Sequence, residues 1–283
     1  MSIYNKTNWV NGSVPAINAT NLNKIEDGVY DGSVLEIKNY INSKNFTPGI
    51  DIIAHRGFMT QYPENTINSA LRAIKLGCSV ECDVQFTSNG GIVLMHDLSV
   101  DRTTNGTGLV ASLTTAYVTG LDAGNKFNAY FNGVKVPTLQ SYLSAIQDAK
   151  HLYIELKSYR TTADIGTLIN VLIEYGFEEK CTVQSFDYQT VLPFIRNVSK
   201  KIRVGALITN QTTFNSNIAV AQSDFNSMML IPTTIATSAN LISCNAAKLP
   251  VGVWTINTSQ ELNDLVAIGY TSLMLNQFLE VPR

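Results

Sequence analysis

Residues 50–57, IDIIAHRG, place a short apolar run directly before His55, Arg56 and Gly57. A run of this kind predicts a buried strand that carries polar side chains at its end. The same arrangement returns soon afterwards, because ECDV at 81–84 and MHD at 95–97 also end strand-like runs. Histidine, arginine and carboxylate side chains therefore gather where predicted strands end.

Strand-like and helix-like stretches alternate over the rest of the chain, which predicts a parallel sheet covered by helices. We predict strands over 50–54, 79–85, 92–95, 151–156, 181–185, 203–208, 227–231, 251–256 and 271–275, and helices that include 65–76, 165–175 and 259–268. The fold class is α/β, and the number of units fits a (β/α)8 TIM barrel. One strand is in excess, so one belongs to a hairpin, for which the SNGG sequence at 88–91 offers a turn. The polar groups lie toward the carboxyl ends of their strands, where barrel active sites form.

Length and composition limit the classes of function. The chain has 283 residues, 45% of them hydrophobic, and a net charge of -2, which allows one large domain with a short accessory segment. No basic stripe indicates nucleic acid, and no apolar run approaches the roughly 18 residues that span a bilayer. The four cysteines form no CxxC pair, so we expect buried thiols. The first residues lack the apolar stretch of a signal peptide, so we expect synthesis in the cytoplasm.

Four carboxylates are candidate metal ligands. Glu81 and Asp83 are two residues apart on a predicted strand, so both side chains face the barrel interior. Glu155 adds a carboxylate at another strand end, and Glu64 lies in the first loop after a strand. Unpaired carboxylates in such an interior repel each other and lose their hydration, and a divalent cation removes that penalty. All-oxygen ligation favours Ca²⁺ or Mg²⁺.

Two of the three histidines are candidate catalytic groups. His55 and His96 each close a strand-like run beside a charged neighbour, so one could take a proton while the other delivers one. His151 begins a predicted strand without such neighbours, and we expect it to be structural.

Cationic and aromatic residues complete the predicted site. Arg56 and Lys157 are candidates for contacts to a phosphate. The alternative is that these two cations only neutralise the carboxylates at the strand ends. Trp254, near the end of a late strand, could form an aromatic wall for a glycerol or sugar group, or could pack in the core.

Nine short motifs, in order, resemble the glycerophosphodiester phosphodiesterase family over about residues 50–280. They are HRG (55–57), PENT (63–66), ECDV (81–84), HD (96–97), DRTTNGTG (101–108), VPTL (136–139), IELK (154–157), QSF (184–186) and WTIN (254–257). The resemblance implies a barrel, a bound divalent cation and cleavage of a phosphodiester that carries a glycerol. It implies Glu64, Glu81, Asp83 and Glu155 as metal ligands, His55 and His96 as general acid and base, and Arg56 and Lys157 as phosphate contacts.

The resemblance leaves the course of the reaction open between attack by the glycerol 2-hydroxyl, through a cyclic product, and direct attack by water. The chain departs from the family near its end, where LMLN at 273–276 replaces a frequent Thr-Asp pair. We expect this departure to affect a contact on the substrate side and to leave the catalytic residues intact.

The first 47 residues differ from the rest in texture and form a predicted helical attachment segment, with the barrel over 48–283. TNWVNG at 7–12 and INATNLNKIEDG at 17–28 resemble the start of tail and baseplate proteins of phages that infect Gram-positive bacteria. This resemblance implies a virion tail protein, with phage tail proteins as partners and a homo-oligomer formed through residues 1–47. The substrate would be glycerol-phosphate teichoic acid of the host wall.

Three alternatives stay open. The first is a metabolic, cytoplasmic phosphodiesterase that acts on small deacylated phospholipids. The second is a sphingomyelinase D-like phospholipase, against which the intact PENT and DRTTNGTG motifs speak. The third is a non-catalytic adhesin that binds teichoic acid, against which the unbroken set of acids and histidines speaks.

Overall fold

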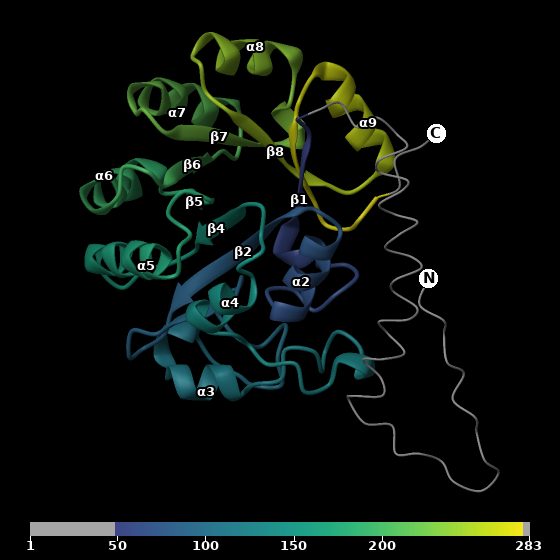
Figure 1. The fold of residues 1–283 in the computed structure, drawn as a ribbon, viewed down its shortest axis with the longest axis vertical. Helices are drawn as coiled ribbons and strands as arrows, with labels where there is room; N and C mark the ends of the chain where they lie inside the picture. The colour runs from purple at the N-terminus through teal and green to yellow at the C-terminus, as the bar shows by residue number, and fades with distance from the viewer. Residues whose placement is uncertain (1–48, 280–283) are drawn as a thin grey trace, which may run out of the picture. The chain divides into compact units, whose positions relative to one another are not determined.

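The computed structural model describes residues 49–279, and the predicted attachment segment, residues 1–47, lies outside them. Within the described part, nine strands form one sheet in the order β1-β9-β8-β7-β6-β5-β4-β2-β3, and β1 also pairs with β2. Eight of these strands are parallel and close into a barrel, with helices on the outer side (Figure 1). The predicted (β/α)8 barrel is confirmed.

The barrel strands are β1 (Asp51–Ala54), β2 (Ser79–Phe86), β4 (Leu152–Leu156), β5 (Cys181–Ser185), β6 (Arg203–Leu207), β7 (Ser227–Pro232), β8 (Val251–Ile256) and β9 (Ser272–Leu275). The excess strand is β3 (Ile92–Leu94), which pairs antiparallel with β2. The predicted hairpin is therefore present, and Gly90 in its turn has a φ of 86°, a left-handed conformation that favours glycine. All nine strands match the predicted ones to within one or two residues.

The helices are α2 (Ile67–Lys75), α3 (Thr115–Gly120), α4 (Leu139–Ala145), α5 (Thr162–Glu174), α6 (Tyr188–Val198), α7 (Gln211–Ser223), α8 (Ser238–Ala246) and α9 (Ser259–Ile268). Side-chain caps fix several of their starts. In α2, Thr66 and Ser69 exchange hydrogen bonds in a capping box, and in α9 Thr258 and Glu261 do the same. Gly269 ends α9 in a left-handed conformation.

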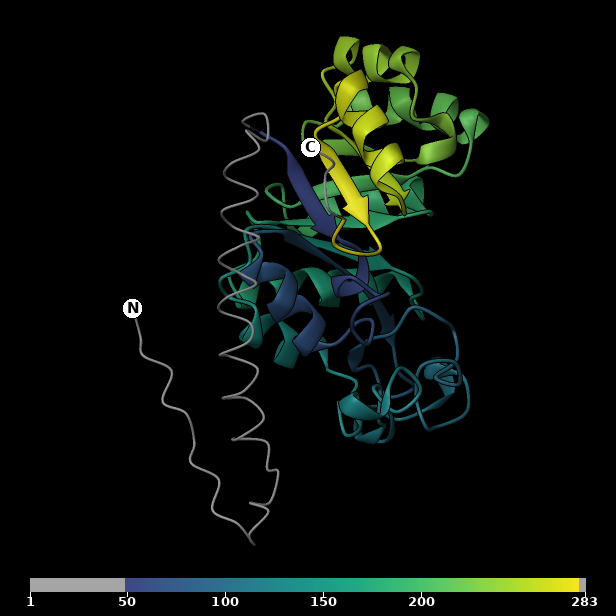
Figure 2. The same ribbon diagram turned by 90° about the vertical axis from the view of Figure 1, so that its right-hand side faces the viewer.

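An excursion between β3 and β4 adds a small layer beside the barrel. It contains α3 and the 3-10 turns Val110–Ser112 and Ala129–Phe131, and Figure 2 shows it in teal, away from the green and yellow helices. The excursion and β3 share a hydrophobic core of Val93, Met95, Val100, Val110, Val118, Leu121, Ala123 and Val136. This segment carries the loop that follows His96.

The barrel interior changes character along its axis. One layer is apolar and consists of Ile53, Tyr153, Leu207, Met228, Leu230 and Met274, with Trp254 packed against it. Toward the carboxyl ends of β2, β4 and β5 the interior residues become Glu81, Asp83, Glu155 and Gln184, all buried. The apolar layer thus forms the floor of a polar site, and the four cysteines of the chain are buried free thiols, as predicted.

Candidate active site

The turn after β1 directs His55 and Arg56 over the end of the barrel. Arg56 has a φ of 51° and Gly57 a φ of 79°, so the chain bends sharply at Gly57 and passes close to α2. A Cβ at Gly57 would overlap the side chain and backbone of Ser69, which explains the glycine here. The amide N–H of Arg56 donates to Oε2 of Glu81 at 2.9 Å. The turn is therefore held against the acidic interior.

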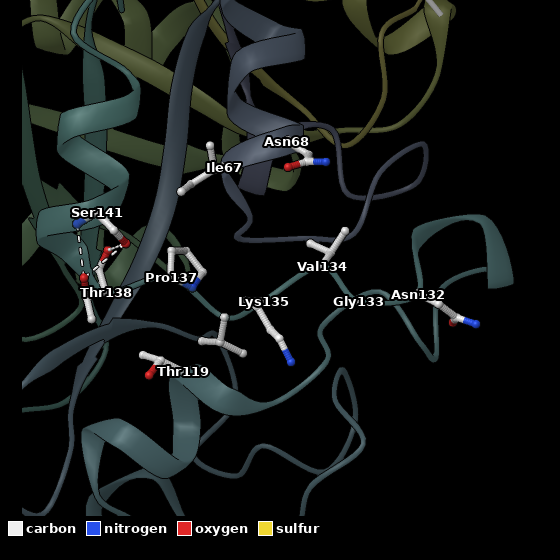
Figure 3. Close-up of a pocket in the computed structure, with 11 residues that line it drawn as sticks. Ile67, Asn68, Thr119, Asn132, Gly133, Val134, Lys135, Pro137, Thr138 and Ser141 are labelled. Carbon is white, nitrogen blue, oxygen red and sulfur yellow. Dashed lines mark hydrogen bonds between the residues drawn. The ribbon is translucent and has the colours of Figure 1, made fainter. Parts of the chain in front are cut away.

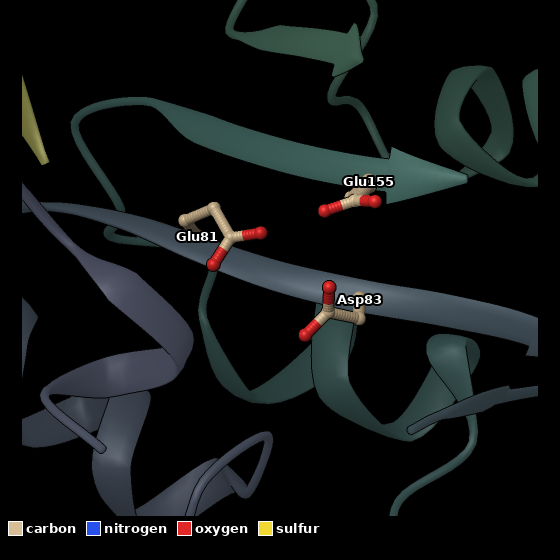
Figure 4. Close-up of side chains that lie close together, drawn as sticks. All are labelled: Glu81, Asp83 and Glu155. Atoms are coloured by element: carbon tan, nitrogen blue, oxygen red, sulfur yellow. The ribbon is translucent and has the colours of Figure 1, made fainter. Parts of the chain in front are cut away.

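Three buried carboxylates converge inside the barrel. Glu81 and Asp83 project from β2, and Glu155 lies opposite Asp83 on the neighbouring strand β4 (Figure 4). One oxygen from each of the three lies within 4.8 Å of the others. The alternation of side chains along β2 accounts for this placement, as the sequence predicted. The sequence-predicted ligands Glu81, Asp83 and Glu155 form one cluster, called here the acidic cluster.

The electrostatics of the acidic cluster fit a bound cation. Burial, with the charges of Asp83 and Glu155, raises the pKa of Glu81 well above its usual value. Burial and the charge of Asp83 likewise raise the pKa of Glu155 to about 7. For Asp83 burial acts in the same direction, but nearby cationic groups, above all Arg56, lower its pKa. Oδ1 of Asp83 is buried without a hydrogen-bond partner. A divalent cation would stabilise all three carboxylates and use this oxygen.

The predicted phosphate contacts also lie at the acidic cluster. Nε of Arg56 is 3.3 Å from Oδ2 of Asp83, and Nζ of Lys157 is 2.7 Å from Oε1 of Glu155 and 3.8 Å from Oδ1 of Asp83. The alternative role of these cations, neutralising strand-end carboxylates, therefore has direct contacts as well. The two roles are compatible, because a cation beside a metal ligand can also face a phosphate.

Glu64 lies apart from the acidic cluster. Its carboxylate accepts from Nη1 of Arg56 at 3.1 Å and from Nη1 and Nη2 of Arg102 at 2.7 and 2.9 Å. Burial would raise the pKa of Glu64, but the hydrogen bond from Arg102 and the charges of both arginines lower it. The structure thus places this sequence-predicted ligand in an arginine clamp, and its role as a metal ligand stays a prediction.

His96 stands beside a carboxylate that is itself held by an arginine. Nδ1 of His96 lies 2.7 Å from Oδ1 of Asp97, and Nε of Arg102 donates to Oδ2 of Asp97 at 2.6 Å. The hydrogen bonds from Arg102 and His96 hold the pKa of Asp97 far below its usual value. A carboxylate at Nδ1 holds the imidazole in a fixed orientation, which suits a group that transfers a proton.

His55 lies at the acidic cluster but has a neutral partner. Its Nδ1 is 2.5 Å from Oδ1 of Asn276, and its Nε2 is 3.9 Å from Oε2 of Glu81. Burial and then the charge of Arg56 lower the pKa of His55 to about 4. We expected the departure from the family at Asn276 to affect only a substrate-side contact. That expectation is wrong, because Asn276 contacts a predicted catalytic histidine.

Trp254 borders the site, whereas His151 lies away from it. The indole Nε1 of Trp254 donates to the carbonyl of Leu230 at 3.0 Å, and its ring meets Phe186 edge to face at 5.8 Å. Nζ of Lys157 lies 5.9 Å from the Phe186 ring, so this aromatic pair borders the site as well as the core. His151 lies at the opposite end of β4, with Nε2 2.9 Å from the hydroxyl of Thr182, in agreement with a structural role.

Three further residues of the site had no role predicted from the sequence. Asn65 donates to Oδ2 of Asp83 at 2.8 Å, Gln184 donates to Oε1 of Glu81 at 3.3 Å, and Arg102 forms the clamp described above. Each lies inside a quoted motif, PENT, QSF or DRTTNGTG. The motifs therefore contained the signal, but only the folded chain reveals which acid each residue contacts.

A cavity of about 600 Å³ lies elsewhere, between the start of α2, the loop before α4 and the end of α3. Figure 3 shows side chains such as Ile67, Lys135 and Pro137 around it. None of the predicted site residues lines this cavity. A much smaller and more enclosed cavity is lined by Glu64 and His96.

Comparisons with known proteins identify the family of the chain. Residues 55–279 match the glycerophosphoryl diester phosphodiesterase family. A glycerophosphodiester phosphodiesterase of Caldanaerobacter subterraneus subsp. tengcongensis is 31% identical over 230 residues, which cover 79% of this chain and 92% of the relative.

Solved structures agree as well. An Oleispira antarctica phosphodiesterase in complex with the product sn-glycerol-3-phosphate has a TM-score of 0.71 and 25% identity, with 80% of this chain and 92% of that one covered. A glycerophosphodiester phosphodiesterase of Agrobacterium tumefaciens has a TM-score of 0.68 and 25% identity, with coverage of 81% and 96%. The family match, the relatives and the shared fold lead to one assignment: the chain belongs to the glycerophosphoryl diester phosphodiesterase family.

Proposed function

We propose that this chain is a metal-dependent phosphodiesterase that cleaves glycerophosphodiester bonds. The observation that carries the proposal is the convergence of the buried acidic cluster with His55, Arg56 and Lys157 at one end of the barrel. Glu81, Asp83 and Glu155 would hold the cation, which is Ca²⁺ or Mg²⁺ because all the donors are carboxylate oxygens. When bound, such a cation polarises a phosphoryl oxygen and offsets the negative charge of the transition state.

The remaining residues divide the work of binding and proton transfer. Arg56 and Lys157 lie beside the acidic cluster and would contact the phosphate oxygens. His55 lies at the cluster with its Nε2 and would take the proton of the attacking hydroxyl. His96, paired with Asp97, would give a proton to the leaving oxygen. The edge-to-face pair of Trp254 and Phe186 would pack against the glycerol.

The finer proposal concerns the substrate and the setting. A glycerol-phosphate teichoic acid is a chain of glycerophosphodiesters, so the same chemistry would act on each unit. Support for this substrate comes from the resemblance of residues 7–28 to phage tail and baseplate proteins. On this proposal the protein is part of a virion tail, is bound to other tail proteins and self-associates through residues 1–47.

A metabolic role on small glycerophosphodiesters is the second candidate. It is favoured by the relative from Caldanaerobacter, which is named only as a glycerophosphodiester phosphodiesterase, and by the sn-glycerol-3-phosphate in the Oleispira structure. Within residues 49–279, no helix is long and apolar enough to cross a membrane.

The deciding experiment compares two substrates. Poly(glycerol phosphate) teichoic acid and glycerophosphocholine are each incubated with the full chain, with Ca²⁺ or Mg²⁺ and with EDTA, and released glycerol phosphate is measured. Asp83→Asn serves as the variant without a complete acidic cluster. Metal-dependent release from the polymer supports the phage enzyme, and turnover of the small diester alone supports the metabolic role. Binding of the polymer without turnover of either substrate would make the protein an adhesin.

A further inference from the structure

Asn276 joins His55 to a second asparagine across the barrel mouth. Asn276 follows β9 directly, and Asn257 follows β8 directly. Nδ1 of His55 is 2.5 Å from Oδ1 of Asn276, and Nδ2 of Asn276 donates to Oδ1 of Asn257 at 2.6 Å. Nδ2 of Asn257 then donates to the backbone carbonyl of Thr255 at 3.0 Å. A single line of hydrogen bonds therefore runs from the imidazole to the main chain.

The backbone carbonyl of Thr255 determines which group donates and which accepts in each hydrogen bond of this line. A carbonyl oxygen can only accept, so Asn257 must turn its amide nitrogen toward Thr255 and its oxygen toward Asn276. Asn276 must in turn give its nitrogen to Asn257 and its oxygen to His55. Only an N–H on Nδ1 can donate to that oxygen. The hydrogen-bond network therefore determines which atom of each side-chain amide is the oxygen and which is the nitrogen.

Backbone contacts keep the two asparagines in place. The amide N–H of Asn276 donates to the carbonyl of Ile256 at 3.3 Å. The amide N–H of Asn257 donates to Oε2 of Glu261 at 2.9 Å, and Nε2 of Gln277 donates to the carbonyl of Asn257 at 3.2 Å. The ends of β8 and β9 are therefore tied together on both sides of the side-chain line.

A neutral imidazole carries one proton, so a proton held on Nδ1 leaves Nε2 with a free lone pair. We infer that Asn257 and Asn276 are positioning residues that hold neutral His55 as its Nδ1–H tautomer, with the lone pair of Nε2 facing the acidic cluster. This inference deepens the proposed function and rests on it, because it prepares His55 to accept the proton of the attacking hydroxyl at Nε2.

Because residue 276 is an asparagine, the tautomer of His55 depends on Asn257. A carboxylate at this position would accept a hydrogen bond with either of its oxygens. An amide accepts with one atom and donates with the other, so a second residue must decide which atom faces the histidine. In this protein Asn257 decides which amide atom of Asn276 faces His55. Without it, Asn276 could turn its nitrogen to His55 and favour the wrong tautomer.

The first test reads the tautomer directly. The chain has three histidines, so the ring nitrogens of the ¹⁵N-histidine-labelled full chain, with Mg²⁺, can be assigned by NMR with His96→Gln and His151→Gln variants. We expect His55 at neutral pH to show a protonated Nδ1 and a bare Nε2. A protonated Nε2 on His55 would overturn the inference.

The second test separates positioning from folding. Asn257→Leu should give a mixture of His55 tautomers and lower kcat about ten- to a hundredfold with little change in KM. Adding Asn276→Asp should restore the Nδ1–H tautomer and most of kcat, because a carboxylate needs no second residue to orient it. Gln260→Ala, which removes a contact to Asp264 within α9, should change neither property.

The possible results distinguish a failure of this inference from a failure of the proposed function. An unchanged tautomer and kcat in Asn257→Leu, or a double variant that regains neither, would overturn the role of the asparagines. Full activity of His55→Ala would instead remove His55 from the chemistry, whatever its tautomer, and would count against the proposed function itself.

Discussion

Nζ of Lys157 lies 2.7 Å from Oε1 of Glu155, directly beside the acidic cluster. This contact stabilises the ionised form of Glu155, but burial and the charge of Asp83 outweigh it and raise the pKa of Glu155 to about 7. Near neutral pH, Glu155 therefore holds a proton part of the time. A cation that binds this carboxylate has to displace that proton.

The first prediction follows from this competition. Affinity for Mg²⁺ or Ca²⁺ should rise with pH through the neutral range, because the protons on Glu155 and Glu81, whose pKa values are both raised, compete with the cation. Each displaced proton corresponds to a loss of about tenfold in affinity for each pH unit below the pKa of its carboxyl group. Calorimetric titration of the full chain between about pH 5.5 and about pH 8 measures this slope. An affinity independent of pH over this range would contradict the prediction.

The second prediction concerns Glu81, the carboxylate for which burial raises the pKa well above normal. Its raised pKa means that the metal-free native state loses stability as pH rises above the ordinary glutamate range. Glu81→Gln should therefore stabilise the metal-free protein by about 1–3 kcal/mol at neutral pH and abolish the further stabilisation by Mg²⁺. Urea unfolding with EDTA and with Mg²⁺ measures both effects.

Glu174→Gln provides the matched control for Glu81→Gln, since Glu174 is an exposed carboxylate at the end of α5. It should leave both the metal-free stability and the response to Mg²⁺ as they are. If Glu81→Gln lowers the stability of the metal-free protein, then Glu81 is already compensated by its neighbours and the acidic cluster does not need a cation.

The third prediction concerns the glycine of the HRG motif. In Gly57→Ala, the new Cβ would overlap Ser69 at a φ of 79°, so the turn must move. We expect a loss of about 2–4 kcal/mol in the free energy of unfolding, together with a large loss of kcat because the turn carries His55 and Arg56. Gly77→Ala is the control, since Gly77 has a φ of 78° but nothing near its Cβ position. A similar loss in both variants would assign the effect to backbone conformation alone.

Short-range patterns predicted most of the fold. Each strand forms from a contiguous apolar run, and side-chain alternation alone brings Glu81 and Asp83 to one interior face. Residue ranges were predicted only for the helices α2, α5 and α9, and the short helices α3 and α4 were missed. They have six and seven residues, too few for a clear helical period, and α3 contributes Val118 to a core assembled from distant segments.

The contacts that complete the site depend on barrel closure. His55 and Asn276 are 221 residues apart in the chain, and they meet only because β1 pairs with β9. Glu64 and Arg102 meet for a different reason, because the excursion beside the barrel brings them together. The sequence could supply the residue types of the site, but the partner of each one follows from packing.

The last prediction concerns His151, the histidine outside the site. Burial lowers its pKa from 6.5 to about 4, and its Nε2 faces the hydroxyl of Thr182 at 2.9 Å. Between these two values the unfolded chain takes up a proton that the native His151 does not, so stability must fall as pH falls from about 6.5 to about 4. His151→Gln should remove on the order of 2 kcal/mol of this acid sensitivity, whatever it does to stability at neutral pH. Urea midpoints at several pH values in this window measure the slope, and only a partial reduction is expected because the pKa of His55 is lowered to about 4 as well. An equally steep slope in His151→Gln would mean that His151 gains its proton without unfolding.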